Sequence, residues 1–209
     1  MPAPGPLHLR NGRSGIVSRA LLTSAMTAAD LRNVRTVFLD RDGTINVKAA
    51  EGEYIRSPAE LELLPGAATA LAALNTAGLR TVLVTNQRWL SEPASDPTHF
   101  TAVQDRLQQL LAGEGARIDA AYHCPHATNS CDCRKPGTGM LLRAATEHGF
   151  ELTESVMIGD SDTDMRAGRA AGTATILLRS GGGASVDADI VVDDLAAAVE
   201  LILSAQAAL

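Results

Sequence analysis

Residues 37–44, VFLDRDGT, join a short apolar run to a polar turn that carries two acids. A second run, TVLVT at 81–85, has the same form and also ends in a polar residue. Continuous apolar runs of this length predict strands that are buried on both faces, which is typical of a parallel sheet covered by helices.

The same alternation continues outward from these two runs. Further strands are predicted at 118–122, 156–160, 173–178 and 189–192. Helices are predicted at about 66–77, 98–113, 138–148, 163–171 and 193–206, and residues 181–183 as a loop. Alternating strands and helices predict an α/β domain: a Rossmann-like parallel sheet with helices on both faces.

Acidic residues follow two of these strands. Asp40 and Asp42 follow the first, and Asp160, Asp162 and Asp164 follow a later one. Either cluster alone is explained by a turn or a helix N-cap. Because ligands bind at the carboxyl edge of such sheets, both clusters together predict an oxygen-rich site suited to Mg²⁺.

Neutral and positive groups are predicted at the same edge. Thr85, Asn86 and Gln87 end the second run and supply hydrogen-bond donors. The chain has sixteen arginines but only two lysines, Lys48 and Lys135, so a lysine is informative where it occurs. Acids, a metal, donors and a lysine together favour phosphoryl transfer.

All the cysteines lie in one stretch, CPHATNSCDC, followed by RKP. Core cysteines or a redox pair with one spare thiol are the alternatives. However, Cys124, His126, Cys131 and Cys133 form a complete ligand set for tetrahedral Zn²⁺. Four protein ligands leave no open position, so a structural zinc that pins a loop is predicted.

The motifs DRDGT, VTNQ, RKP and IGDSDTD, in that order, resemble those of the haloacid dehalogenase superfamily of aspartate-nucleophile phosphatases. The segment CPH followed by CDCRKP further resembles its zinc-bearing subgroup, which includes heptose-bisphosphate and histidinol-phosphate phosphatases. The resemblance covers about residues 35–203 and implies a phosphatase without a large cap domain. The spacing between the motifs leaves no room for one.

The resemblance also implies roles for the acids. Asp40 would be the nucleophile that forms an aspartyl-phosphate, and Asp42 the general acid and base. Asp40, the backbone carbonyl of Asp42, and Asp160 would hold Mg²⁺. Asp164 would support the metal ligands or cap the following helix.

Further roles follow for the polar and basic residues. Thr85, Asn86 and Lys135 would bind the transferring phosphoryl group, and Arg134 would contact the substrate. Lys48 is expected to be a solvated surface charge.

Two departures from the subgroup bear on the substrate. Arg88-Trp89 stands where relatives have small residues. We expect Trp89 to pack in the core, with a role as a wall of the substrate pocket as the alternative. Arg88 is a candidate to bind a distal phosphate of the substrate. Ser161 stands where heptose-bisphosphate phosphatases commonly carry lysine.

Several substrates and one function of another class remain. A heptose 1,7-bisphosphate that loses its 7-phosphate ranks first, histidinol phosphate second, and another small sugar phosphate third. A noncatalytic zinc-stabilised binding scaffold is the competing function of another class.

Composition limits the partners and the location. A net charge of −6 disfavours nucleic-acid binding, and no apolar run reaches the roughly 18 residues of a membrane span. Residues 1–33 are expected to be a flexible extension and residues 34–209 the phosphatase domain. We expect a cytoplasmic monomer that binds a small phosphorylated metabolite and needs no cofactor beyond Mg²⁺ and Zn²⁺.

Overall fold

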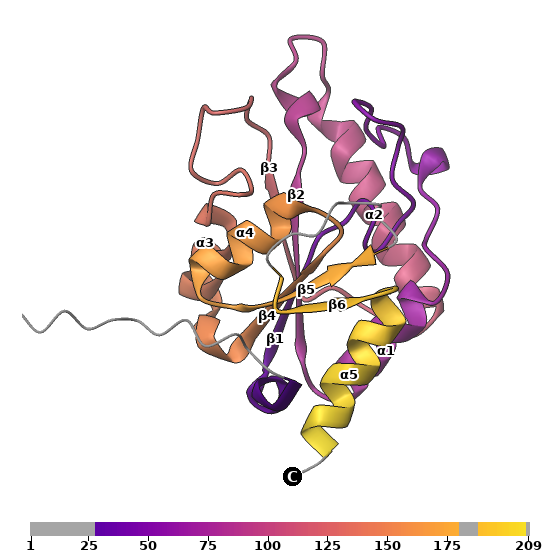
Figure 1. Cartoon of the computed structure of the whole chain (residues 1–209). Helices are drawn as coiled ribbons and strands as arrows, with labels where there is room; N and C mark the ends of the chain where they lie inside the picture. The colour runs from indigo at the N-terminus through magenta and orange to yellow at the C-terminus, as the bar shows by residue number, and fades with distance from the viewer. Residues whose placement is uncertain (1–27, 180–187, 208–209) are drawn as a thin grey trace, which may run out of the picture.

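A computed structural model describes residues 28–179 and 188–207. Six strands form one sheet in the order β3-β2-β1-β4-β5-β6, and each neighbouring pair is parallel (Figure 1). The strands are β1 (Thr36–Leu39), β2 (Arg80–Asn86), β3 (Ala120–Cys124), β4 (Ser155–Gly159), β5 (Ala174–Leu178) and β6 (Ile190–Val192). The predicted Rossmann-like parallel sheet is confirmed.

Five α-helices connect or follow the strands. They are α1 (Ala67–Thr76), α2 (Pro97–Gly113), α3 (Gly139–His148), α4 (Asp162–Ala171) and α5 (Leu195–Ala207). Four short 3₁₀ helices, which the sequence did not predict, are η1 (Ala28–Asn33), η2 (Pro58–Glu60), η3 (Arg88–Ser91) and η4 (Leu152–Glu154). Each α-helix lies where the apolar periodicity predicts one, with its ends shifted by at most two residues.

The sheet separates two apolar cores. Successive side chains of a strand point to opposite faces, so in β1 Val37 and Leu39 enter one core and Phe38 enters the other. Buried apolar residues of α1, α2 and α5 belong to the first core, and those of α3, together with Ala167 of α4, belong to the second. Figure 1 shows the two groups of helices on opposite sides of the sheet.

The N-terminal boundary differs from the expected one. Residues 1–27 of the predicted extension lie outside the described residues, as does the loop predicted at 181–183. Residues 28–33 form η1, which contacts α5 and buries Leu31 completely. This part of the expected extension is therefore packed against the domain. Among the described residues, no helix has the length and apolar character needed to cross a bilayer.

The carboxyl edge of the sheet has little to cover it in the described part of the chain. The connections that leave β1 and β2 at this edge contain only the short helices η2 and η3 before α1 and α2 begin. The expected absence of a large cap domain is confirmed for residues 28–179 and 188–207. Small molecules therefore have direct access to the ends of the strands.

Candidate active site and zinc cluster

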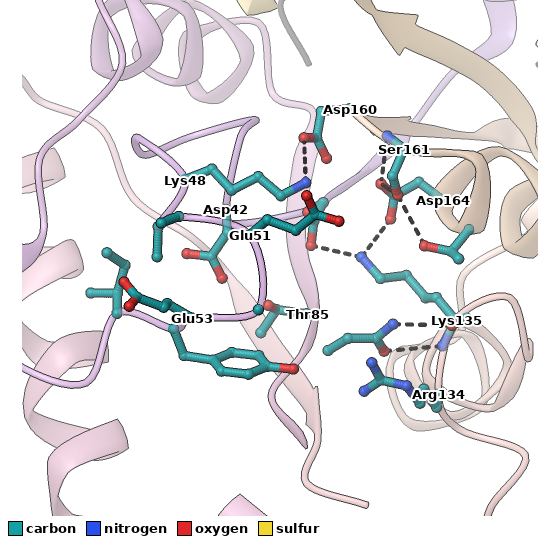
Figure 2. Close-up of a pocket in the computed structure, with 18 residues that line it drawn as sticks. Asp42, Lys48, Glu51, Glu53, Thr85, Arg134, Lys135, Asp160, Ser161 and Asp164 are labelled. Carbon is teal, nitrogen blue, oxygen red and sulfur yellow. Dashed lines mark hydrogen bonds and ion pairs between the residues drawn. The ribbon is translucent and has the colours of Figure 1, made fainter. Parts of the chain in front are cut away.

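The predicted site residues converge on one cavity of about 520 Å³ at the carboxyl edge of the sheet (Figure 2). Asp40 follows β1, Thr85 and Asn86 end β2, and Asp160 follows β4. Because parallel strands end at the same edge, residues 120 positions apart in sequence meet here. The loop of residues 48–55, between β1 and α1, lines the opposite wall of the cavity.

Lys135 is the central cation of the site. Its Nζ atom lies 2.7 Å from Oδ1 of Asp40 and 2.6 Å from Oδ1 of Asp164, and it donates to the carbonyl oxygen of Val84 at 2.7 Å. Only 3% of Lys135 is exposed. These contacts fix the ammonium between two carboxylates, where it also faces the cavity.

The environment of Asp40 opposes its ionisation. Burial raises the pKa of this carboxyl group to about 7; Lys135 lowers it, and the neighbouring Asp164, Asp42 and Asp160 raise it further. Burial likewise raises the pKa of Asp160. The buried carboxyl groups outnumber the buried cations beside them. This imbalance indicates that a further cation binds among the carboxyl groups.

The acid cluster fits a hard divalent cation. Carboxylate oxygens of Asp40, Asp160 and Asp164 lie within 4.8 Å of one another. Oδ1 of Asp160 is buried and has no hydrogen-bond partner among the described residues. Magnesium accepts such oxygen donors, so Asp40 and Asp160 suit the predicted Mg²⁺ site. The metal role of the Asp42 carbonyl stays a prediction.

Gly43 makes room for this cluster. Its φ of +93° is a left-handed conformation that side chains disfavour. A Cβ atom at this position would also collide with the carboxylate of Asp160. The glycine of the DRDGT motif therefore serves both the turn and the acid cluster.

The Asp42 carboxylate has a separate environment from that of Asp40. It accepts hydrogen bonds from Nη2 of Arg41 at 3.0 Å, Nδ2 of Asn46 at 3.0 Å and Nε2 of Gln87 at 2.9 Å. Arg41, Asn46 and Gln87 are all fully buried, whereas the Asp42 side chain is 21% exposed. Rigid donors thus hold Asp42 at the cavity wall.

Asn86 supports Lys135. Its Oδ1 atom accepts from the backbone N–H of Lys135 at 3.0 Å, and its Nδ2 atom donates to the Lys135 carbonyl at 3.0 Å. The side chain expected to bind the phosphoryl group is thus occupied with positioning the lysine. Thr85 lines the cavity, and its Oγ1 atom accepts from Nε2 of Gln87 at 2.8 Å.

Besides Lys135, two basic residues of the described chain line the cavity. Arg134 lines the cavity, and its Nη1 atom is buried without a hydrogen-bond partner within residues 28–179 and 188–207. The Lys48 side chain is 57% exposed, in line with the expected solvated charge, but its Nζ atom also lies 2.9 Å from Oδ2 of Asp160 at the cavity (Figure 2). The path of the loop after β1, which no local pattern specifies, brings it there.

Asp164 caps the following helix, one of the two roles considered for it. Its carboxylate accepts from the backbone N–H of Ser161, at 3.2 Å, and from the Ser161 hydroxyl, at 2.6 Å, at the start of α4. It also contacts Lys135. The N-cap therefore fixes this carboxylate against the lysine.

The Arg88-Trp89 segment forms η3 and lies outside the cavity lining. Trp89 is 1% exposed and donates from Nε1 to Oε1 of Gln87 at 2.9 Å. Packing, the favoured expectation, is therefore what the structure shows. Arg88 is exposed and does not line the cavity, so nothing in the geometry supports its contact with a distal phosphate.

The cysteine cluster has the dimensions of a zinc site. The Sγ atoms of Cys124, Cys131 and Cys133 are 3.2 to 3.5 Å apart, and Nδ1 of His126 lies 3.2 Å from Sγ of Cys133. Tetrahedral zinc bonds of 2.0 to 2.3 Å place ligand atoms about 3.3 to 3.8 Å apart, so these four atoms lie slightly closer together than a bound zinc would hold them. The cysteines are unpaired, so all four residues fit the predicted structural Zn²⁺.

The zinc cluster and the cavity share one short loop. Cys133 is followed by Arg134 and Lys135, and the loop folds back so tightly that a Cβ atom at Gly137 would collide with the carbonyl of Asp132. Cys124, the first ligand, is the last residue of β3 and is fully buried. The cluster thus anchors the loop that carries both basic residues to the sheet.

Comparisons with known proteins agree with this geometry. Residues 132–198 match the HAD-hydrolase-like family model. A D-glycero-D-manno-heptose-1,7-bisphosphate 7-phosphatase of Thermosynechococcus vestitus is 40% identical over 79% of this chain and 94% of its own length. The chain belongs to the haloacid dehalogenase phosphatase family. A D-glycero-beta-D-manno-heptose-1,7-bisphosphate 7-phosphatase of Photorhabdus laumondii is 35% identical over 79% of this chain and 93% of its own length.

A solved structure supports the same family assignment. It is that of D,D-heptose 1,7-bisphosphate phosphatase from B. bronchiseptica, complexed with magnesium and phosphate. It is 34% identical, has a TM-score of 0.76, and matches 82% of this chain and 99% of its own. As a haloacid dehalogenase phosphatase, the chain has the expected enzyme class, phosphoric monoester hydrolase.

Proposed function

We propose that the chain removes the 7-phosphate of D-glycero-D-manno-heptose 1,7-bisphosphate in a Mg²⁺-dependent reaction through an aspartyl-phosphate. One observation carries the chemistry: Asp40 and Asp42 lie in one turn but in different environments. Asp40 lies with the acid cluster and Lys135, whereas Asp42 is held by neutral amides and Arg41. A nucleophile and a proton donor need such a difference.

In the first step, a carboxylate oxygen of Asp40 attacks phosphorus, and the bond from phosphorus to the ester oxygen breaks. Asp42 donates a proton to the leaving oxygen, which departs as an alcohol. Lys135 contacts Asp40 and is placed to offset the negative charge that the phosphoryl group brings into the cavity.

In the second step, Asp42, now ionised, takes a proton from water as the water oxygen attacks phosphorus. The bond between phosphorus and Asp40 breaks, and inorganic phosphate leaves. Magnesium held by Asp40 and Asp160 would neutralise charge on the phosphoryl oxygens. These residue roles belong to the proposal.

The substrate is proposed from the relatives and from the cavity. Relatives with 32 to 40% identity carry the heptose-bisphosphate phosphatase name. The cavity has a volume of about 520 Å³, and Nη1 of Arg134, which has no hydrogen-bond partner among the described residues, is a donor available to a ligand. This space suits a small phosphorylated sugar.

Location and partners are further parts of the proposal. We place the enzyme in the cytoplasm, in heptose biosynthesis, as a monomer that binds neither nucleic acid nor membranes. The net charge of −6 supports the exclusion of nucleic acid. The roles of Mg²⁺ and Zn²⁺ are proposed as catalytic and structural, respectively.

The test is phosphate release from heptose 1,7-bisphosphate and histidinol phosphate, measured side by side with and without Mg²⁺. Fast and selective cleavage of the heptose 7-phosphate supports the proposal, and preference for histidinol phosphate rejects the substrate. Asp40→Asn is the control and should abolish release in a folded protein. Absence of release from any small phosphate ester would instead favour the noncatalytic scaffold.

A further inference from the structure

The two lysines of the chain contact the acid cluster in different ways. Lys135 is enclosed, with 2% of its side chain exposed, and contacts Asp40, Asp164 and a backbone carbonyl. The Lys48 side chain is 57% exposed and enters from the loop after β1, where among the described residues it pairs with Asp160. One cation is therefore fixed by the fold, and the other lies at the rim.

The carboxylate that Lys48 contacts is part of the candidate metal site. The Asp160 side chain is 1% exposed, and its Oδ2 atom lies 2.9 Å from Lys48 Nζ. Its Oδ1 atom has no hydrogen-bond partner in the part of the chain that the structure describes. The same residue belongs with Asp40 and Asp164 to the cluster whose donor atoms lie within 4.8 Å of one another. An ammonium at Oδ2 and a divalent cation at Oδ1 would compete for the single negative charge of this carboxylate and repel each other.

We propose that Lys48 is an exchangeable counter-cation: it occupies Asp160 in the metal-free enzyme and leaves when a divalent cation binds the acid cluster. The inference goes beyond the proposed function because it concerns metal affinity and not the substrate. It rests on that function only in taking the acid cluster as the metal site.

Charge and access both favour the exchange of Lys48 and not of Lys135. Three carboxylates, those of Asp40, Asp160 and Asp164, face one fixed ammonium, so a divalent cation in place of Lys48 balances the cluster. Lys48 has a flexible stem that is already more than half exposed and can swing toward water. Removing Lys135 would leave two buried carboxylates without their partner.

The first experiment is calorimetric titration of Mg²⁺ into the zinc-loaded protein without substrate, at fixed pH. Lys48→Met keeps the length of the side chain and removes its charge. It should lower the Kd for Mg²⁺ by about threefold to tenfold, because a partly exposed ion pair no longer has to be broken. An unchanged or higher Kd in the folded variant overturns the proposal.

Arg143→Met is the matched control. Arg143 is also partly exposed and pairs with Glu147 on α3, away from the cavity lining. This variant loses the same charge and should keep the Kd of the wild type. If the Kd for Mg²⁺ fell equally in both variants, the change in net charge alone would explain the effect, and the proposal would be overturned.

A second measurement uses the unmodified chain. Because only two lysines are present, labelling by an amine-reactive reagent can be assigned to Lys48 and Lys135 by mass spectrometry. Adding Mg²⁺ should speed the labelling of Lys48 at least about twofold as its ammonium leaves Asp160, while the enclosed Lys135 stays protected. A labelling rate of Lys48 that does not rise with Mg²⁺ overturns the proposal. Neither measurement depends on phosphatase activity, so failure of the proposed function would be seen separately.

Discussion

Asn86 holds the backbone of Lys135 by both ends of its amide, with two hydrogen bonds of 3.0 Å. One residue comes from the end of β2 and the other from the zinc loop, 49 positions later in the sequence. The pair therefore connects the sheet to the loop that supplies the central cation.

Asn86→Ala should lower kcat by about tenfold to a hundredfold, because Lys135 loses the two contacts that orient its backbone. Asn75→Ala is the matched control. The Asn75 amide bonds the backbone of Arg117 and the hydroxyl of Thr81, and Thr81 lies near the start of β2, away from the cavity. The control should lower the midpoint of thermal unfolding and keep kcat. Equal losses of kcat in both variants would contradict a positioning role for Asn86.

Asp42→Asn should lower kcat by about 10² to 10⁴-fold, since the amide keeps the shape but cannot donate or accept the proton. Gln87→Ala removes one of the donors that hold Asp42 and should give a smaller loss. A substrate whose leaving group needs no proton, such as a nitrophenyl phosphate, should recover much of the first step in Asp42→Asn. If Asp42→Asn slowed the first step as much with the nitrophenyl phosphate as with the sugar phosphate, general-acid catalysis by Asp42 would be contradicted.

Cys131→Ser should reduce bound zinc and lower both thermal stability and turnover, because the loop that carries Arg134 and Lys135 loses its anchor. Zinc content by mass spectrometry, the unfolding midpoint and kcat are measured on the same sample. Ser130→Ala changes the neighbouring residue, which bonds only the carbonyl of Ala127. This control should retain zinc and activity; full zinc content and turnover in Cys131→Ser would refute the assignment.

Metal-free stability should fall as pH rises toward neutrality. Burial raises the pKa of Asp40 from 3.8 to about 7, so within this window the folded state holds a proton that the unfolded state has lost. The free energy of unfolding therefore decreases from about pH 4 to about pH 7. Chemical denaturation without added Mg²⁺ should show a smaller decrease in Asp40→Asn than in the wild type. The same pH dependence in both proteins would contradict the shifted pKa.

Much of this molecule is predictable from its sequence because its signals are local. The apolar runs predicted all six strands, and the helical periodicity predicted all five α-helices. The zinc ligands lie within ten residues, so their spacing is sufficient to identify them. The 3₁₀ helices were missed because three to six residues carry too little periodicity.

The contacts that orient the catalytic groups could not be predicted in the same way. Arg41 reads as a charged turn residue, yet it is fully buried and donates to Asp42 and to Gln104 of α2. The orientations of the Lys48 and Gln87 side chains also depend on hydrogen-bond partners more than 40 positions away in the sequence. The rarity of lysine was a signal for Lys48, but only the path of its loop decides which group it contacts.

Gly43 offers the metal no donor atom from a side chain, but its missing methyl group leaves the space that the Asp160 carboxylate occupies. An alanine there would retain every acid of the site and still displace one of them. The size of the ion-binding space is thus set by a residue with nothing to coordinate. Inactivating changes in this enzyme should therefore include positions that a search for ligands and charges alone would pass over.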